Sequence, residues 1–188
     1  MNSDTAAKNI KKRIMDGNHP SDSGQIMQRL LLIRHAKAAA FGREPGDHGR
    51  PLSSTGLAHA HRLGDILRAA DWVPDLAIVS SAQRTLDSWQ AMAMQTCPVM
   101  VEEKLYLASP KTLAEEARQQ GESGKTLALV GHNPGIAILA HQFLDKGFDH
   151  DGPASRLLNG QFKTGWAAAF ELREQGPRLA ALFDPRAL

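Results

Sequence analysis

The sequence has almost no cysteine, little excess charge of either sign and no long apolar run, and each shortage excludes a class of protein. Cys97 is the only cysteine of 188 residues, which excludes a disulfide within the chain and fits a reducing compartment. The formal net charge is only +2, so we expect no general affinity for nucleic acid or for a membrane surface. No apolar run approaches the roughly 18 residues of a membrane span, and no signal-peptide core is visible. These shortages predict a cytoplasmic protein.

The composition is that of an ordinary globular protein. Hydrophobic residues make up 42% of the chain and charged residues 22%, and the length is sufficient for one domain with a substantial core. Residues 1–27 differ, because they are rich in small polar residues and lysine and have few large apolar side chains. We therefore expect a loosely ordered N-terminal extension over residues 1–27 and one folded domain over residues 28–188.

Apolar runs and helical patterns alternate along the folded domain, which predicts an α/β fold. Three runs are typical of strands buried on both faces of a parallel sheet: Leu30–Ile33, Leu76–Val79 and Leu127–Val130. Helices are predicted over Ser53–Ala70, Ala82–Met94, Pro110–Gln120 and Gly135–Leu144, with an edge strand at Val99–Val101. Trp166–Leu172 and Arg178–Phe183 predict a closing antiparallel pair. The expected architecture is a three-layer sandwich with helices on both faces of a mostly parallel sheet.

Each of the three buried strands is followed by a cationic or imidazole side chain. Arg34 and His35 follow the first strand, Arg84 lies in the first turn of the helix after the second, and His132 follows the third. The carboxyl ends of parallel strands meet at one edge, where such sheets bind their ligands. The sequence therefore predicts that these four side chains share one site.

Two helices are predicted to begin at this edge. Ser80 or Ser81 can cap the helix that carries Arg84, while Asn133 suits an N-cap and Pro134 the first helical position of the next helix. Free N–H groups at helix N-termini favour an anion, and forked guanidinium donors match phosphoryl oxygens. A phosphoryl group is accordingly the predicted ligand.

These motifs resemble the histidine phosphatase superfamily, which has the phosphoglycerate-mutase-like fold. The resemblance rests on Arg34-His35-Ala36, on Arg84 after Ser80-Ser81, and on His132 after Gly131. The compact length, Arg50-Pro51-Leu52-Ser53 followed by Gly56, and Leu105-Tyr106 are more similar to its SixA-type phosphohistidine phosphatases. The resemblance covers roughly residues 28 to 184 and implies a catalytic domain. The family has Arg-His-Gly where this chain has Ala36, which excludes a positive φ at that position.

The residues predict a mechanism, and the resemblance implies the same roles at the matched positions. His35 is the expected nucleophile, and it must be neutral, with its other ring nitrogen donating to a backbone carbonyl. Arg34, Arg84, His132 and Asn133 are expected to hold the phosphoryl oxygens. No metal-ligand spacing is present, so no metal or other cofactor is expected.

Three residues keep alternative interpretations. Arg50 is either a further phosphate contact or a salt-bridged loop residue. The acid that protonates the leaving group is either Glu103, which follows the edge strand, or Asp47 in the loop beside the site. SixA-type enzymes lack a clear equivalent of the mutase acid, so a site with no acid is a third possibility.

Three functions remain open from the sequence. The first is dephosphorylation of phosphohistidine on a protein such as a histidine-phosphotransfer domain, which is favoured because no long insert that could enclose a metabolite is evident. The second is a small-molecule phosphomonoesterase or mutase of the same fold. The third is a non-catalytic phosphate-binding module, against which the complete Arg/His/Arg/His set argues. The expected partner is a phosphorylated protein or small phosphorylated compound, with no nucleic acid and no membrane.

Overall fold

The computed structural model describes residues 29–40, 46–121, 125–146 and 161–187, so the predicted extension over residues 1–27 lies outside the described residues. Its strands are β1 (Arg29–Arg34), β2 (Leu76–Ser80), β3 (Val99–Glu102), β4 (Thr126–Gly131), β5 (Ala167–Arg173) and β6 (Gly176–Phe183). Its helices are α2 (Ser54–Ala69), α3 (Gln83–Met92), α4 (Pro110–Gln120) and α5 (Gly135–Lys146), with a 3₁₀ turn, η1 (Glu103–Leu105). None of these helices is long and apolar enough to cross a bilayer.

All six strands form one sheet in the order β3-β2-β4-β1-β5-β6. β3, β2, β4 and β1 are mutually parallel, whereas β5 runs antiparallel to β1 and pairs with β6 as a hairpin. Arg34 at the end of β1 is level with Gly131 at the end of β4. This register places the residues that follow both strands, His35 and His132, at the same edge. The predicted mostly parallel sheet with antiparallel pairing near the C-terminus is confirmed.

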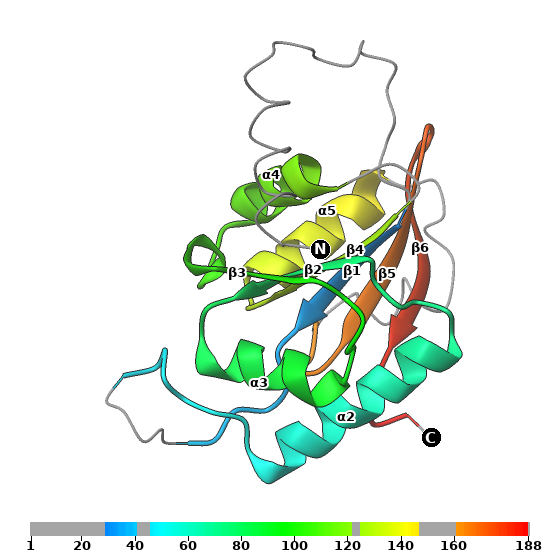
Figure 1. Ribbon diagram of the computed structural model, residues 1–188. Coiled ribbons are helices and arrows are strands. Elements are labelled where there is room, and N and C mark those ends of the chain that lie inside the picture. The colour runs from blue at the N-terminus through cyan, green and yellow to red at the C-terminus, as the bar shows by residue number, and fades with distance from the viewer. Residues whose placement is uncertain (1–28, 41–45, 122–124, 147–160, 188) are drawn as a thin grey trace, which may run out of the picture.

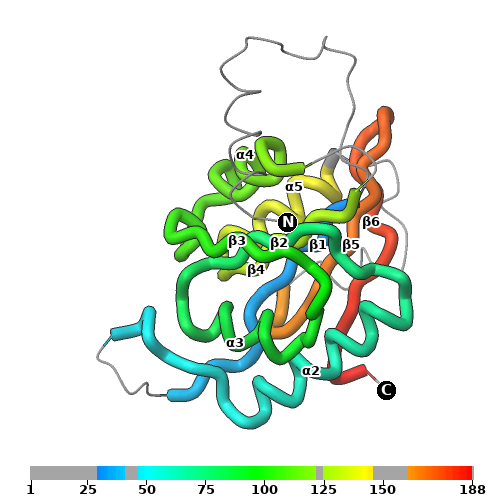
Figure 2. The backbone as a smooth tube through the Cα atoms, in the orientation of Figure 1, coloured from blue at the N-terminus to red at the C-terminus, as the bar shows by residue number. Residues whose placement is uncertain are grey.

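Helices cover both faces of the sheet, as Figure 1 shows. Leu30 and Leu32 of β1 pack into one apolar cluster with residues of α4 and α5, while Leu31 and Ile33 pack into a second with residues of α2 and α3. Successive side chains of a strand point to opposite faces, so the continuous apolar run of β1 fills both clusters. The backbone trace shows the two helix pairs on opposite sides of the sheet (Figure 2). The three-layer prediction is therefore confirmed.

The chain segment after β1 is attached to the start of α2. Ser53 caps α2 by accepting a hydrogen bond from the Gly56 amide (N···O 3.0 Å), and its hydroxyl donates to the Lys37 carbonyl (3.0 Å). A side chain at position 56 would collide with that carbonyl, so glycine is required for the contact. The loop that follows His35 is thus held against the α2 N-terminus.

The residues predicted to cap or open α3 and α5 differ in detail from those in the structure. The N-cap of α3 is Ala82, which has no side-chain cap, because the hydroxyls of Ser80 and Ser81 bind histidine side chains instead. α5 begins at Gly135, the predicted start of the helix, so Pro134 precedes the first helical residue instead of occupying that position, and its carbonyl accepts from the Ile138 amide (2.9 Å). Both helices nevertheless begin at the predicted edge of the sheet.

Candidate active site

The ends of β1 and β4 bring the two predicted histidines together. The His35 amide donates to the carbonyl of Gly131 (3.0 Å), which continues the pairing of the two strands by one residue. The ring centroids of His35 and His132 are 5.1 Å apart, with the ring planes tilted by 56°. The convergence that the sequence predicts at this edge is therefore present for the imidazole pair.

The surroundings of His35 favour a neutral imidazole. Its Nδ1 lies 2.7 Å from the carbonyl oxygen of Ala36, which can only accept, so Nδ1 carries the proton and Nε2 keeps its lone pair. Burial lowers the pKa of His35 to about 4, and the positive charges of Arg84 and Arg34 act in the same direction. The imidazole is therefore neutral at neutral pH, and Nε2 keeps its lone pair.

Ala36 fits the loop although the resembled family has glycine there. Positive φ among the described non-glycine residues occurs at Asp71, Ala93 and Leu107, so Ala36 does not need the left-handed conformation. Its side chain is buried and its amide donates to Ser88 Oγ (3.0 Å), while the Ser88 hydroxyl donates to the carbonyl of Arg84 (2.6 Å). Ser88 thus connects the loop that follows His35 to the helix that carries Arg84.

His132 is buried and held by Ser80 at the end of β2. The Ser80 hydroxyl and His132 Nε2 are 2.8 Å apart, and Nδ1 has no hydrogen-bond partner within the described ranges. Burial lowers the pKa of His132 to about 3, helped by the neighbouring His35 and Arg84, so this ring is also neutral. When Ser80 donates to Nε2, the ring proton lies on Nδ1, which then has a hydrogen bond to give to a ligand.

Arg84 is buried and is bound by Asp47. Nη1 donates to the Asp47 backbone carbonyl (2.6 Å) and Nη2 to its carboxylate oxygen Oδ2 (2.8 Å). The same Oδ2 accepts from the Tyr106 hydroxyl (3.0 Å), and Oδ1 accepts from Arg50 Nη1 (2.7 Å). Partial burial pushes the pKa of Asp47 upward, but the hydrogen bonds from Arg50, Tyr106 and Arg84 hold it below its usual value. An ionised carboxylate therefore lies against the most buried guanidinium of the site.

Arg34 and Asn133 lie on the flank of the site that faces α5. Arg34 Nη1 (2.7 Å) and Asn133 Nδ2 (3.0 Å) both donate to the carbonyl of Phe162. They border a cavity of about 420 Å³, lined by Arg34, Asn133, Ala137, His141, Gln161, Phe162, Lys163, Thr164 and Arg186. The predicted pair of arginines is thus divided: Arg84 lies beside Tyr106 and the imidazoles, and Arg34 borders a basic cavity next to them.

Arg50 and Glu103, which had alternative interpretations from the sequence, do not contact the imidazole pair. Arg50 binds Asp47 and donates twice to the Ala39 carbonyl, from Nε (3.0 Å) and Nη2 (2.8 Å), which corresponds to the salt-bridged interpretation rather than to a direct phosphate contact. Glu103 is exposed in η1, and within the described ranges its carboxylate has no hydrogen bond or ion pair to the site. The structure therefore brings neither residue against the imidazole pair.

Three residues that sequence reasoning did not place in the site belong to it: Ser80, Ser88 and Tyr106. The Tyr106 ring lies edge-on to His132, with centroids 5.4 Å apart, and also contacts His48 (4.8 Å). Ser80 and Tyr106 were present in the motifs, the first as a possible helix cap and the second in a family signature. The signal that locates them is their position, since Ser80 is the last residue of β2 and Tyr106 directly follows η1.

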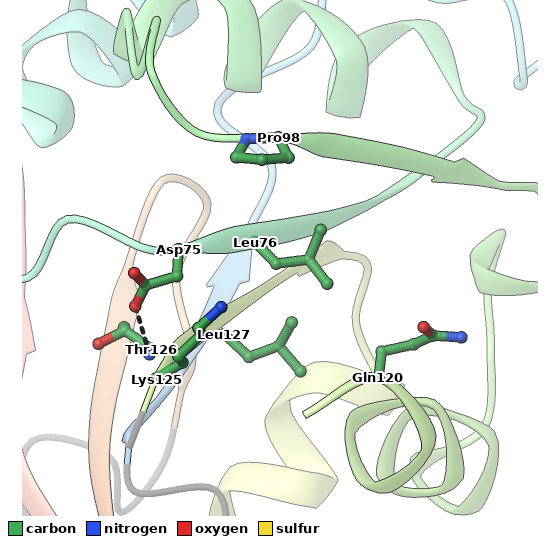
Figure 3. Close-up of a pocket in the computed structure, with 7 residues that line it drawn as sticks. All are labelled: Asp75, Leu76, Pro98, Gln120, Lys125, Thr126 and Leu127. Atoms are coloured by element: carbon green, nitrogen blue, oxygen red, sulfur yellow. Dashed lines mark hydrogen bonds between the residues drawn. The ribbon is translucent and has the colours of Figure 1, made fainter. Parts of the chain in front are cut away.

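A second cavity lies at the opposite end of the sheet, where β2 and β4 begin (Figure 3). It has a volume of about 200 Å³, and in it the Asp75 carboxylate accepts from the Thr126 amide (2.8 Å). It contains none of the predicted site residues. Within the described part of the chain, no three His, Cys, Asp or Glu side chains are grouped so as to hold a metal ion.

Comparisons with known proteins agree with this geometry. Residues 30–106, which include His35 and Arg84, match the profile of the histidine phosphatase superfamily (branch 1). An uncharacterized protein of Mycobacterium tuberculosis is 35% identical over 108 residues, covering 57% of this chain and 67% of that protein.

Two solved structures described as candidate phosphohistidine phosphatases SixA are similar over most of the chain. The structure from Agrobacterium tumefaciens is 27% identical with a TM-score of 0.72, covering 85% of this chain and 99% of its own. The structure from Nakamurella multipartita is 25% identical with a TM-score of 0.74, covering 85% and 97%. The likeness thus extends beyond residue 106, to the part of the sheet that carries His132.

Proposed function

The chain belongs to the histidine phosphatase superfamily, and we propose that it is a phosphatase that works through a phosphohistidine at His35. One observation carries this proposal. His35 Nδ1 is committed to the Ala36 carbonyl, so that Nε2 is unprotonated, and the ring lies beside His132 at the sheet edge that also receives Arg84. A neutral imidazole with one free nitrogen next to cationic and N–H donors suits attack on phosphorus.

The reaction has two displacements. In the first, His35 Nε2 forms a bond to phosphorus as the bond to the leaving group breaks, and the leaving atom takes up a proton from solvent. In the second, water attacks phosphorus and gives one proton to solvent, the P–N bond to Nε2 breaks, and inorganic phosphate leaves. Arg84 and His132 Nδ1–H stabilise the charge on the equatorial oxygens in both steps, with Arg34 contributing from the α5 side. No metal or cofactor is expected to take part.

Ser80 and Ser88 are positioning residues in this scheme. Ser80 orients His132 through its bond to Nε2, and Ser88 holds the Ala36 amide beside the carbonyl of Arg84. Preorganised donors stabilise a transition state because no reorientation is needed as charge develops. Their hydroxyls therefore act on the reaction through the residues that contact the phosphoryl group.

Phosphohistidine on another protein is the substrate that we propose. The names of the two similar structures favour it, as does the exposure of Glu103, because an enzyme without a strong acid needs a good leaving group. The P–N bond of phosphohistidine breaks readily once its ring is protonated, whereas an alkoxide leaving group depends on an acid.

A small phosphorylated compound is the second candidate, and one observation favours it. The cavity beside Arg34 also includes Lys163 and Arg186, which could bind a further acidic group of such a compound. The third interpretation, a non-catalytic phosphate-binding module, would have no use for the free Nε2 of His35.

Trapping the intermediate tests the proposal. The protein is mixed with a phosphohistidine peptide, quenched without acid and digested for mass spectrometry, and we expect a phosphate adduct on His35. His35→Ala should give neither adduct nor turnover, while His61→Ala, which removes a largely exposed histidine of α2, should behave like the wild type. An adduct on another residue would exclude His35 as the nucleophile.

A further inference from the structure

We propose that Asp47 is an internal competitor for the phosphoryl site: its carboxylate occupies the Arg84 donor that a bound phosphate needs, and must be displaced before phosphate binds. The inference deepens the proposed function and rests on it, since it assumes that Arg84 holds the phosphoryl group. It assigns a role to a residue that the reaction scheme does not use.

The contacts of Asp47 are those of a bound oxyanion. Oδ2 accepts hydrogen bonds from Arg84 Nη2 (2.8 Å) and from the Tyr106 hydroxyl (3.0 Å). The Tyr106 ring in turn lies edge-on to His132, whose Nδ1 has no partner within the described ranges. A phosphoryl oxygen at this position would accept from the same two donors. The carboxylate therefore imitates one oxygen of the ligand.

Sharing Arg84 between the two anions is unfavourable. The Arg84 side chain is only 5% exposed, so a phosphoryl group and the Asp47 carboxylate bound to the same guanidinium would lie close together and repel one another. Positive charge near Asp47 comes from Arg84 and Arg50, because His35 and His132 are neutral at neutral pH. Exchange of one anion for the other is therefore favoured over binding of both.

Displacement is feasible because Asp47 has a second cationic partner. Its side chain is 47% exposed, and Oδ1 is bound by Arg50 Nη1 (2.7 Å). Arg50 is itself held by two hydrogen bonds to the Ala39 carbonyl, so it can keep the carboxylate at the surface after Arg84 is released. The exchange breaks one ion pair of Asp47 and preserves the other.

The backbone carbonyl of Asp47 binds Arg84 in a different way from the carboxylate. It accepts from Arg84 Nη1 (2.6 Å), and this bond need not break when the carboxylate leaves Nη2. The segment is also bound to the start of α3, where the Gln83 amide donates to the His48 carbonyl (3.0 Å). Residue 47 thus orients the guanidinium through its main chain and competes for it through its side chain.

The consequence is weaker binding of phosphate than the cationic site would otherwise have. Binding of the product is reduced by the free energy needed to remove the carboxylate, which assists release and limits inhibition by free phosphate. Asp47→Asn keeps the shape of the side chain and removes its charge. We expect it to bind inorganic phosphate about tenfold more tightly, because the ligand no longer displaces a charge-assisted hydrogen bond.

The test is a titration with inorganic phosphate, followed by isothermal calorimetry and by ³¹P NMR, with Kd as the readout. Asp47→Ala repeats the charge removal without an amide, and Asp65→Asn is the matched control, since Asp65 pairs with Arg68 on the surface of α2. Both Asp47 variants should tighten binding, and Asp65→Asn should leave Kd unchanged. In an Arg84→Met background, Asp47→Asn should change Kd by less than twofold.

An equal or larger Kd in Asp47→Asn overturns the inference, as does the same gain in the Arg84→Met background. Failure of the proposed function is recognised separately, by wild-type protein that binds phosphate but forms no adduct on His35. Thermal melting of each variant confirms that the folded protein is being compared.

Discussion

Ser80 at the end of β2 and His132 after β4 are 52 residues apart in the sequence and joined by a buried 2.8 Å hydrogen bond. The bond satisfies Nε2 of His132 and leaves Nδ1 as the nitrogen without a partner among the described residues. The packing of β2 beside β4 therefore determines that Nδ1, and not Nε2, is the nitrogen of His132 left to bind a ligand.

Ser80→Ala should destabilise the fold by about 1–3 kcal/mol, because it leaves a buried ring nitrogen without a partner. It should also lower kcat, by less than removal of His132 does, since the imidazole remains but loses its orientation. Chemical denaturation and steady-state kinetics measure the two effects. Ser81→Ala is the control, because the bond of Ser81 to His48 is exposed, and a similar loss there would refute a special role for Ser80.

Arg84→Met and His132→Ala should each reduce kcat by on the order of 10²-fold or more, as removal of one preorganised charge stabiliser does. Steady-state kinetics on a phosphohistidine peptide provides the measurement. Arg62→Met, which removes an exposed arginine bonded to the Ala187 carbonyl, should be close to wild type. Near-normal activity in either site variant would remove that residue from the proposed site.

The acid limb of the pH profile should lie far below the usual imidazole range. An ordinary histidine has a pKa near 6.5, and burial lowers that of His35 to about 4. Proton uptake by Nε2 would abolish nucleophilicity, so His35 should remain active as pH falls from 7 to 5 and lose activity near pH 4. Titration of the His35 ring by NMR reports the pKa directly. A midpoint near 6.5 would contradict the buried, neutral ring.

The same shifts affect stability. His35 and His132 have folded-state pKa values below their unfolded ones, so the unfolded state binds more protons between about pH 6.5 and the lowered values. Their stabilising contribution is therefore full above pH 6.5 and is lost as pH falls through about 4 and 3. Urea unfolding of the wild type and of His35→Asn, from pH 7 to pH 4, should give a steeper decline for the wild type.

EDTA should leave kcat/KM unchanged, because the proposed chemistry uses only side chains. Vanadate should inhibit competitively, because it adopts the five-coordinate geometry of phosphorus in the transition state. Assays with and without EDTA, after dialysis, check the first expectation. Loss of activity that is restored by a divalent cation would show that a metal takes part.

Phosphohistidine peptides should have a higher kcat/KM than 3-phosphoglycerate or an alkyl phosphate. The reason is the leaving group, since the exposed Glu103 is poorly placed to protonate an alkoxide. Glu103→Gln should accordingly change kcat little on the peptide. Efficient hydrolysis of an alkyl phosphate, combined with a large loss in Glu103→Gln, would favour the small-molecule enzyme instead.

The sequence by itself determined the fold and the meeting of the two histidines at one edge of the sheet. Runs such as Leu30–Ile33 are apolar throughout because both faces of their strands are buried, and that pattern is local. The rule that the carboxyl ends of parallel strands meet at one edge then predicts that His35 and His132 lie together, as they do. The free Nε2 of His35 could also be anticipated, because its partner is the carbonyl of the next residue.

Only the tertiary structure decided which hydrogen-bond partner each side chain at this edge of the sheet has. Arg84 binds Asp47, 37 residues away, Arg34 binds the Phe162 carbonyl, 128 residues away, and Ser80 binds a histidine instead of capping its helix. Each of these groups has several possible partners of similar energy, and the choice depends on which loop lies within hydrogen-bond distance. That distance is set by the packing of segments far apart in the chain, which no local pattern encodes.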